Sequence, residues 1–405
     1  MIHPRMKNLY VGVDLHRRTH TAVLINCFKE KLFEITFLNK PSEFETTLKE
    51  IKKHVPRGKS LVWGLEDISN YGKSLTSYLI NKKQTVKYVN PNLTYSDRNS
   101  QAILHKTDLE DAFSVAKVTV DNFDSLPDAT IKDNYWILSQ LVSRRRSLVK
   151  SSVTLKNQIH NHISQHYPSY KKFWSVFDST SALEFWQTYP SPQKLQNVGA
   201  EELGSFLWKH SRGYYSFDKA AQILKCVADD GNTTTEYQST RDFIVSTSVI
   251  QLKQNMQSIK EIEEELKDIL PSFGYKLETM KGINTVMAAE FIAEINDINR
   301  FATADKLAKY AGLSPVVYAS GQTDKHFSNR RGDRKLHELF FKLAVTVSNE
   351  CGHAKKPVNP IFREYYKKKI SQGKTTKQAL KAVMRRLCNI IFWMMKNKSE
   401  YIQPK

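Results

Sequence analysis

The chain has 405 residues, which is enough for two or three domains, and its 40% hydrophobic content is that of a folded protein. Its 61 basic and 41 acidic residues give a net charge of +20, which points to a polyanionic partner, most often nucleic acid. The four isolated cysteines argue against a disulfide framework or a zinc site. With no signal-peptide core and no apolar run of about 18 residues, we expect a cytoplasmic protein that does not span a membrane.

Residues 1–130 predict an α/β domain. Segments rich in β-branched and aromatic residues predict strands at 8–14, 19–27, 31–38, 60–66 and 85–89. Helical patterns follow at 42–54, at 72–82 and from about 108 onward, and Asn90-Pro91 ends the last strand. Three meandering strands followed by helix–strand–helix–strand–helix is the element order of the ribonuclease H-like fold, which Holliday-junction resolvases share.

Four carboxylates stand where that fold would bring them together. Asp14 and Glu66 end the first and fourth strands, and Asp108 with Asp111 lie three residues apart at the start of the last helix. Such a set is costly unless a cation lies between its members, so a divalent metal site is predicted. The structural alternative for Asp108 and Asp111 is a helix N-terminus with its usual acids. Asp67 is a possible substitute ligand, but in a strand it would face the opposite side from Glu66.

The remainder of the chain is predicted to be mostly helical. We expect long helices at about 134–166 and 241–270, an aromatic-rich insertion of short helices at 167–235, and helices at about 304–311, 333–350 and 376–396. The domains are therefore expected at 1–130, at 131–272 as a helical and coiled-coil region with that insertion, and at 273–405.

The helix at 241–270 carries a heptad-spaced apolar stripe. Its members are Val245, Val249, Leu252, Met256, Ile259, Leu266 and Leu270, with Glu263 at the one polar position. This pattern is typical of a coiled-coil hairpin or a dimer seam, and the alternative is a helix that packs on its own domain.

The last region holds a possible nucleophile and several phosphate-binding candidates. Residues 280–289 resemble the turn and second helix of a helix–hairpin–helix, in which a glycine turn presents backbone N–H groups to a phosphate. Ser320 precedes Gly321 in a polar loop, and Ser314 and Ser328 compete with it as nucleophile candidates. The candidate nucleic-acid contacts are Arg144, Arg145, Arg146, Lys281, Gly282, Arg330, Arg331 and Arg334.

Four sequence pieces together resemble the DEDD transposases of bacterial insertion sequences of the 110/1111 group. Their order and spacing match from about residue 8 to about residue 350. The pieces are Tyr10-Val-Gly-Val-Asp14; Gly64-Leu-Glu66 with Tyr71-Gly72; Val89-Asn-Pro91 leading to Lys106-Thr107-Asp108 and Asp111-Ala112; and Gly312-Leu-Ser-Pro315 leading to Ser320-Gly321 and Arg331-Gly332-Asp333.

The resemblance implies a bacterial DNA recombinase, cytoplasmic and associated with the nucleoid when bound to DNA. Asp14, Glu66, Asp108 and Asp111 then correspond to the acidic tetrad and Ser320 to a nucleophile that forms a transient phosphoserine link. Two Mg²⁺ ions, for which Mn²⁺ can substitute, would be held about 4 Å apart by the tetrad. The resemblance also implies a bridge RNA that pairs with element ends and target DNA, and a homodimer or homotetramer whose active sites are shared between subunits.

Two alternatives remain open from the sequence. One is a Mg²⁺-dependent, structure-specific endonuclease, similar to a junction resolvase, that uses water and not Ser320. The other is a non-catalytic nucleic-acid-binding scaffold whose acids are structural.

Overall fold

The computed structural model describes residues 4–67, 71–100, 107–129, 133–314, 316–320, 323–327, 332–352 and 355–403, with the backbone alone at 98–100, 133, 316–320 and 323–327. The chain divides into two compact units, Met1–Asp133 and Asn134–Lys405, here called the N-terminal and C-terminal units. No helix in the described ranges is long and apolar enough to cross a lipid bilayer.

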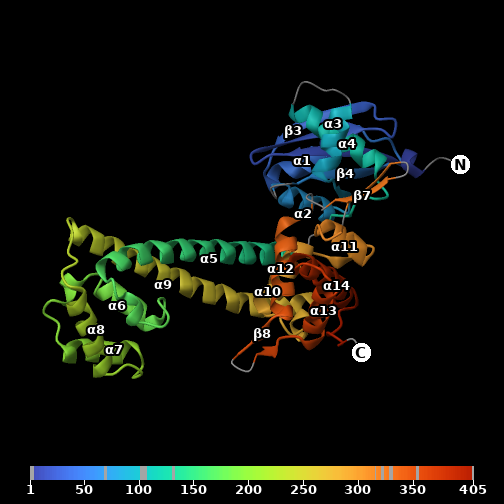
Figure 1. The fold of residues 1–405 in the computed structure, drawn as a ribbon. Helices are drawn as coiled ribbons and strands as arrows, with labels where there is room; N and C mark the ends of the chain where they lie inside the picture. Colours follow the sequence, from blue (N-terminus) through green and yellow to red (C-terminus); the bar gives the residue numbers. More distant parts are fainter. Residues whose placement is uncertain are drawn as a thin grey trace. The chain divides into compact units, whose positions relative to one another are not determined.

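The N-terminal unit is built on a mixed five-stranded sheet with strand order β3-β2-β1-β4-β5 (Figure 1). The strands are β1 (Asn8–Leu15), β2 (Thr19–Ile25), β3 (Lys31–Leu38), β4 (Ser60–Glu66) and β5 (Thr85–Tyr88), each within two residues of its predicted bounds. β2 is antiparallel to both β1 and β3, whereas β4 runs parallel to β1 and to β5. The predicted mixed α/β architecture is thus confirmed for this unit.

Helices cover both faces of the sheet. Leu9, Val11 and Val13 of β1 pack in one apolar cluster with residues of α1 (Pro41–Lys53) and α2 (Lys73–Asn81). Tyr10 belongs to a second cluster, with Ala112, Ala116 and Val120 of α4 (Asp108–Asp121). Because successive side chains of a strand point to opposite faces, α4 lies on the face toward which even-numbered residues of β1 point.

The structure contains an α-helix in this unit, α3 (Pro91–Ser100), that the sequence pattern did not predict. It begins where Asn90-Pro91 suggested only the end of a strand. The Asn90 side-chain oxygen accepts a hydrogen bond from the backbone N–H of Asn92 at 2.9 Å, and Pro91 occupies the first helical position. An asparagine cap followed by proline starts a helix as readily as it ends a strand.

The C-terminal unit contains a long antiparallel helical hairpin formed by α5 (Asp133–His166) and α9 (Gln238–Ile269) (Figure 1). Arg145 of α5 bonds Glu263 of α9, and Ser151, further along α5, bonds Asn255, which lies earlier on α9. Residues later on α5 thus pair with residues earlier on α9, so the two helices are antiparallel. Both helices belong to the same chain, which forms the hairpin without a partner subunit.

Most of the heptad stripe is buried within the C-terminal unit. Val245, Val249 and Leu252 pack in one core cluster, and Leu266 and Leu270 pack in another. Met256 is an exception to the prediction, because 39% of its surface is exposed while the neighbouring Asn255 is buried. The stripe is therefore covered within one chain, and its use as a dimer seam stays a prediction.

The insertion, which lies between α5 and α9 in the sequence, packs on these two helices in an apolar cluster distinct from the one that holds Leu266 and Leu270. Its helices are η2 (Tyr170–Lys172), α6 (Thr180–Thr188), η3 (Pro192–Leu195), α7 (Ala200–His210) and α8 (Phe217–Asp230). Aromatic side chains such as Tyr167, Phe173, Phe185 and Trp186 are fully buried there against the ends of α5 and α9. The predicted run of short helices is confirmed, and its aromatic richness is explained by this core.

The rest of the C-terminal unit is a helical body with two small hairpins. Its elements are η4 (Leu270–Phe273), η5 (Leu277–Thr279), α10 (Thr285–Ile295), η6 (Ile298–Arg300), α11 (Ala304–Tyr310), β6 (Val316–Ser320), β7 (Thr323–Phe327), α12 (Arg334–Ser348), β8 (Glu350–Cys351), β9 (Lys356–Pro357), α13 (Pro360–Ser371) and α14 (Thr376–Asn397); η1 (Pro4–Lys7) precedes β1 in the other unit. Leu138 and Val142 of α5 share the core of this body. The base of the long hairpin is therefore continuous with the helical body, whereas the sequence analysis drew a domain boundary near 272.

Candidate functional site

The parallel pairing of β1 and β4 sets two of the predicted carboxylates side by side. Asp14 and Glu66 are register partners at the C-terminal ends of these strands. Residues directly opposite each other on paired strands point to the same face of the sheet. This is the face that α4 covers.

Two glycines bring α4 down onto this face. A Cβ atom on Gly12 would lie 2.2 Å from both the Ala112 carbonyl oxygen and the Ala116 nitrogen. A Cβ on Gly64, the register partner of Gly12, would lie 1.9 Å from the Thr119 hydroxyl oxygen. Because neither position has a side chain, the α4 backbone packs directly on β1 and the Thr119 side chain of α4 packs directly on β4.

The first turn of α4 therefore begins close to the strand ends. The Thr107 hydroxyl caps this helix by accepting a hydrogen bond from the Glu110 backbone N–H at 3.2 Å. Asp108 and Asp111 both lie in that first turn. The strand ends and the helix start together form what we call the acid edge, which comprises Asp14, His16, Glu66, Asp108 and Asp111.

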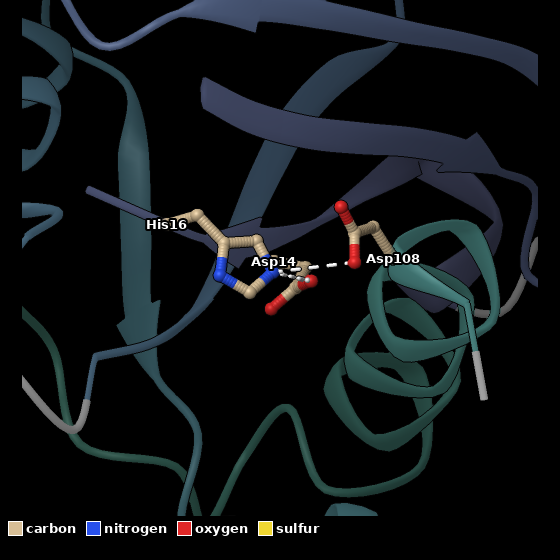
Figure 2. Close-up of side chains that lie close together, drawn as sticks. All are labelled: Asp14, His16 and Asp108. Atoms are coloured by element: carbon tan, nitrogen blue, oxygen red, sulfur yellow. Dashed lines mark ion pairs between the residues drawn. The ribbon is translucent and has the colours of Figure 1, made fainter. Parts of the chain in front are cut away.

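Three side chains of the acid edge meet closely (Figure 2). His16 Nε2 lies 3.0 Å from Asp14 Oδ2 and 3.3 Å from Asp108 Oδ1. Asp14, His16 and Asp108 each offer one ligand atom, and these atoms all lie within 4.8 Å of one another, so the three could hold a metal ion. His16 was not among the predicted ligands, although its place two residues after Asp14 was a signal, because such residues share a strand face.

The surroundings of Asp14 disfavour its ionised form. Burial raises the pKa of its carboxyl group above the ordinary value. The neighbouring His16 lowers this pKa, while the negative charges of Asp111 and Asp108 raise it. A cation placed among these groups would relieve both the desolvation and the repulsion between carboxylates.

The remaining carboxylates lie next to this cluster. The Thr94 hydroxyl of α3, which is fully buried, donates a hydrogen bond of 2.5 Å to Glu66 Oε2. Asp111 is near enough to affect the pKa of Asp14. Asp67 accepts a hydrogen bond from the Gly72 backbone N–H at 3.1 Å, just before α2, which packs on the other face of the sheet. Asp67 thus serves the start of α2, as its expected orientation suggested.

Ser320 lies in the C-terminal unit, at the end of β6. Its backbone pairs with Thr323 of β7, and we call β6 and β7 the serine hairpin. The Ser320 side chain, Gly321, Ser328, Arg330 and Arg331 lie outside the described residues. Ser314 is half-buried ahead of β6.

The base of the serine hairpin is attached to the helical body. The Asp333 backbone N–H donates to the Tyr310 carbonyl oxygen at 2.7 Å. A Cβ on Gly332 would lie 2.3 Å from the Gly312 nitrogen, so the two glycine backbones are in direct contact. The chain therefore leaves and re-enters the body at one place, between the end of α11 and the start of α12.

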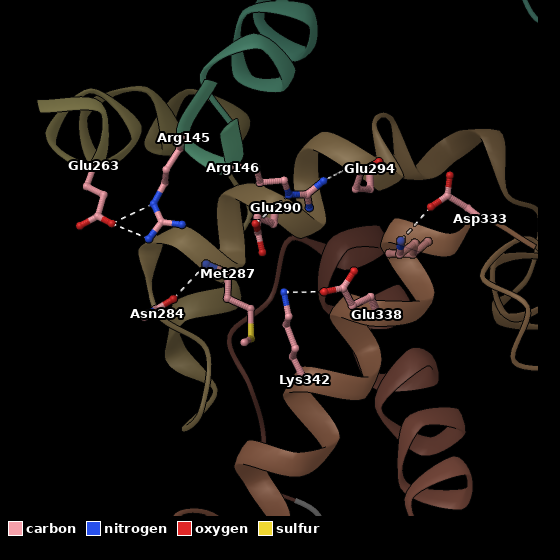
Figure 3. A network of polar contacts seen from close by, with 11 residues as sticks. Arg145, Arg146, Glu263, Asn284, Met287, Glu290, Glu294, Asp333, Glu338 and Lys342 are labelled. Carbon is pink, nitrogen blue, oxygen red and sulfur yellow. Dashed lines mark hydrogen bonds and ion pairs between the residues drawn. The ribbon is translucent and has the colours of Figure 1, made fainter. Parts of the chain in front are cut away.

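Two of the predicted nucleic-acid contacts are bound by carboxylates within the chain (Figure 3). Arg145 bonds Glu263 of α9 at 2.8 Å. Arg146 bonds Glu290 and Glu294 of α10 at 2.9 and 2.6 Å. These arginines therefore fasten α5 to α9 and α10, and a role in nucleic-acid binding stays a prediction for them.

The other described basic candidates have accessible side chains. Arg144, Lys281 and Arg334 are exposed. Gly282 has a φ of +106°, as the predicted turn requires, and the Asn284 side chain caps α10 by accepting from the Met287 N–H at 2.9 Å. The element before this turn is the short η5, so the likeness to a helix–hairpin–helix is limited to the turn and the second helix.

Two family models match the chain. Residues 11–168 match the DEDD transposase model of the IS110 type, described as a transposase, and residues 274–367 match the model of the transposase IS116/IS110/IS902 family. The first match contains the four predicted acids, and the second contains Ser320.

Curated relatives match over nearly the whole chain. The insertion element IS116 uncharacterized 44.8 kDa protein of Streptomyces clavuligerus is 24% identical over 97% of this chain and 96% of the relative. The insertion element IS900 uncharacterized 42 kDa protein of Mycobacterium paratuberculosis is 24% identical over 97% of each chain. The pilin gene-inverting protein of Moraxella bovis is 22% identical over 98% of each chain. The chain belongs to the DEDD transposases of the IS110 group of insertion elements and is a DNA transposase or recombinase.

Proposed function

We propose that this transposase cuts and rejoins DNA through a metal site at the acid edge and a serine nucleophile, Ser320. The metal ligands would be Asp14, Glu66, Asp108 and Asp111, and the ion would be Mg²⁺, which Mn²⁺ can replace. The observation that carries the proposal is the meeting of Asp14 and Asp108 around one imidazole at 3.0 and 3.3 Å. Membership of the DEDD transposases also implies that a divalent metal is used.

The residues of the acid edge fit a hard divalent cation. Carboxylate oxygens are the ligands that Mg²⁺ prefers. Burial, and then the charges of Asp111 and Asp108, raise the pKa of Asp14, and a bound cation would offset both effects. A cation here would compete with His16 for the oxygens of Asp14 and Asp108. When bound, a pair of such ions neutralises charge on the attacked phosphate and polarises its oxygens. The strand order 3-2-1-4-5 supports assigning this unit to the ribonuclease H-like fold.

Ser320 would attack a backbone phosphate of the DNA. Its Oγ gives up its proton and forms a bond to phosphorus while one P–O bond of the strand breaks, and the departing oxygen takes up a proton. Rejoining reverses the exchange: a strand hydroxyl attacks the same phosphorus, and Oγ leaves as the serine hydroxyl. A phosphodiester is present at every stage, so strand exchange needs no external energy source.

The acids and the serine complement each other. A serine hydroxyl is a weak nucleophile until a base or a metal activates it. The acid edge has carboxylates for a metal, but none of its members is a serine, threonine or cysteine. We therefore propose that one subunit supplies the acid edge and another supplies Ser320, within a homodimer or homotetramer.

The DNA would be selected by a guide RNA. The family resemblance implies a bridge RNA that pairs with target and donor DNA, and the net charge of +20 supports binding of a second polyanion. Purifying the protein from cells that carry its element and sequencing the bound nucleic acid tests this part. One discrete structured RNA would support the guided mechanism, and random RNA fragments would contradict it.

The catalytic proposal is tested by trapping a covalent protein–DNA species. Wild-type protein incubated with DNA carrying the element ends and Mg²⁺ should give a species that survives denaturation. Ser320→Ala should remove it, whereas Ser314→Ala, a matched serine variant, should keep it. Asp14→Ala should lose cleavage and adduct together.

Other outcomes would favour different functions. Normal cutting by Ser320→Ala would show that water is the nucleophile and that the protein is a hydrolytic endonuclease. Binding of DNA or RNA by every variant, with cleavage by none and none by the wild type, would indicate a non-catalytic scaffold.

A further inference from the structure

A cavity lies at the base of the serine hairpin. Its volume is about 420 Å³, and its lining residues are Ala311, Gly312, Gly332, Arg334, His337, Glu338 and Phe341. Gly312 and Gly332 are the residues whose backbones touch where the hairpin meets the helical body. Sites of this size commonly hold ligands as large as one nucleotide.

The chemistry of the lining suits a nucleotide. Phe341 is a large apolar side chain that remains 44% exposed, so its ring is available for stacking. Arg334 is exposed in the first turn of α12, where both its charge and the helix dipole favour a phosphate. The His337 ring is held by a 3.1 Å hydrogen bond from Nδ1 to the Ala311 carbonyl oxygen, which leaves Nε2 for another partner.

A second cavity, here called the cationic cavity, lies on a neighbouring face of α12. Its volume is about 320 Å³, and its lining residues are Arg145, Arg146, Val149, Lys150, Glu290, Lys335, Glu338, Leu339 and Lys342, so five cations face two acids. Glu338 lines both cavities and pairs with Lys342 at 2.8 Å (Figure 3). Residues of an α-helix are spaced by about 100°, so Lys335 and Lys342 lie roughly a quarter turn around α12 from Arg334 and Phe341.

The cationic cavity has positive charge to spare. Arg146 is neutralised by Glu290 and Glu294, Arg145 by Glu263, and Lys342 by Glu338. Lys150 and Lys335 are exposed and form no ion pair with any described residue. Two exposed lysines without carboxylate partners, on the wall of one hollow, are suited to a phosphate.

We propose that the first turns of α12 bind the DNA strand next to the bond that is cut. One unstacked nucleotide would enter the 420 Å³ cavity and stack on Phe341, with its phosphate at Arg334. The neighbouring phosphate would lie in the cationic cavity at Lys150 and Lys335. The inference rests on the proposed function in one respect, the identity of the bound strand. The strand is taken to be the DNA that is cut because the cavity adjoins the hairpin that carries Ser320. A base can enter such a cavity only after leaving its stack, so the occupant is an unpaired nucleotide.

The test measures binding without catalysis. Full-length Ser320→Ala protein in EDTA would be titrated into a fluorescein-labelled, 12-nucleotide single-stranded DNA of mixed sequence, and anisotropy would give Kd at several salt concentrations. Phe341→Ala should weaken binding about tenfold to a hundredfold without changing the salt dependence. Lys150→Gln combined with Lys335→Gln should weaken binding and flatten the plot of log Kd against log salt by about 0.7 per lost phosphate contact.

Matched variants control for general effects. Trp393→Ala removes another exposed aromatic of the same unit, and Lys377→Gln with Lys381→Gln removes two other exposed lysines from α14. Both should leave Kd within about twofold of the Ser320→Ala parent. Phe341→Leu, which keeps the apolar bulk but not the flat ring, should weaken binding nearly as much as Phe341→Ala.

Three outcomes would overturn the inference. The first is a Phe341→Ala protein with unchanged Kd, and the second is dependence on Phe341 with a 12-nucleotide RNA but not with the DNA. The third is a Phe341→Ala protein that changes oligomeric state while its DNA affinity stays the same. If the wild type forms no serine–DNA adduct but single-strand binding depends on Phe341, the catalytic proposal fails and this inference stands. If the wild type forms the serine–DNA adduct but single-strand binding does not depend on Phe341, the catalytic proposal stands and this inference fails.

Discussion

The acid edge and the serine hairpin are held in place in different ways, although each depends on a glycine that brings two backbones together. The acids lie on β1, β4 and α4, which share a buried sheet core, and Gly12 sets the distance between β1 and α4. Ser320 ends a five-residue strand whose base is fixed by the Gly312–Gly332 contact and the Asp333–Tyr310 hydrogen bond. The comparison teaches that the acid edge is built on the core of one unit, whereas Ser320 is carried on a small hairpin of the other unit.

The largest expected effect on stability comes from filling the space above β1. Gly12→Ala would place a methyl group 2.2 Å from backbone atoms of Ala112 and Ala116, which cannot rotate away. We expect a loss of about 3 kcal/mol in the free energy of unfolding, together with loss of cleavage, because α4 must move. Gly199→Ala, where a Cβ meets nothing within 4 Å, should cost no more than about 1 kcal/mol in the same urea titration. Equal losses in the two variants would contradict this account of α4.

The matching change in the other unit should separate activity from stability. Gly332→Ala would bring a methyl group 2.3 Å from the Gly312 nitrogen and so displace the base of the serine hairpin. Adduct formation should fall by about 10²-fold, the loss typical of a misplaced reacting group. Metal binding to the acid edge, followed by isothermal calorimetry with Mn²⁺, should stay unchanged. A weaker Mn²⁺ affinity would show that the two regions are not independent in this way.

The smallest effect concerns the charge at Asp14. Its folded-state pKa is raised by burial, so the ionised carboxylate is less stable in the folded protein than in the unfolded chain. This penalty is absent below the unfolded pKa of about 3.9 and grows as the pH rises towards the folded pKa. Asp14→Asn should therefore raise the melting temperature slightly at pH 7 without metal, and the gain should vanish near pH 3.

Metal should reverse that order of stability. Added Mg²⁺ should stabilise the wild type, by about 1.4 kcal/mol at tenfold excess over its Kd, and should leave Asp14→Asn almost unchanged. Identical Mg²⁺ responses in differential scanning calorimetry would remove Asp14 from the set of metal ligands. Asp128→Asn, an exposed carboxylate paired with Lys87 at 2.8 Å, is a suitable control in the same unit.

Much of the acid edge could be predicted because it depends on local sequence. Asp14 and Glu66 end buried strands, and parallel strand ends meet at one edge of a sheet. His16 was overlooked because the prediction considered carboxylates alone, although its spacing from Asp14 was visible. α3 was missed because Asn90-Pro91 is compatible with both a strand end and a helix start.

Other features depend on long-range contacts that no local pattern encodes. Three adjacent arginines suggest a phosphate site, yet Arg145 and Arg146 are bound by carboxylates more than a hundred residues away. The exposure of Met256 follows from its neighbour Asn255, which bonds Ser151 on the opposite helix. The cavity at Phe341 could not be foreseen, because its walls come from segments on both sides of the serine hairpin.

The most direct test of the central claim mixes two inactive proteins. Asp14→Asn and Ser320→Ala would be co-expressed in equal amounts with different affinity tags. The tags would show that mixed dimers form, and strand cleavage of an element-end DNA would be measured on the whole, unfractionated mixture. If the acid edge of one subunit works with Ser320 of another, each variant alone is inactive and a mixed dimer has one intact site, so the equal mixture should recover about a quarter of wild-type activity. A mixture that contains mixed dimers but stays inactive would contradict the shared site.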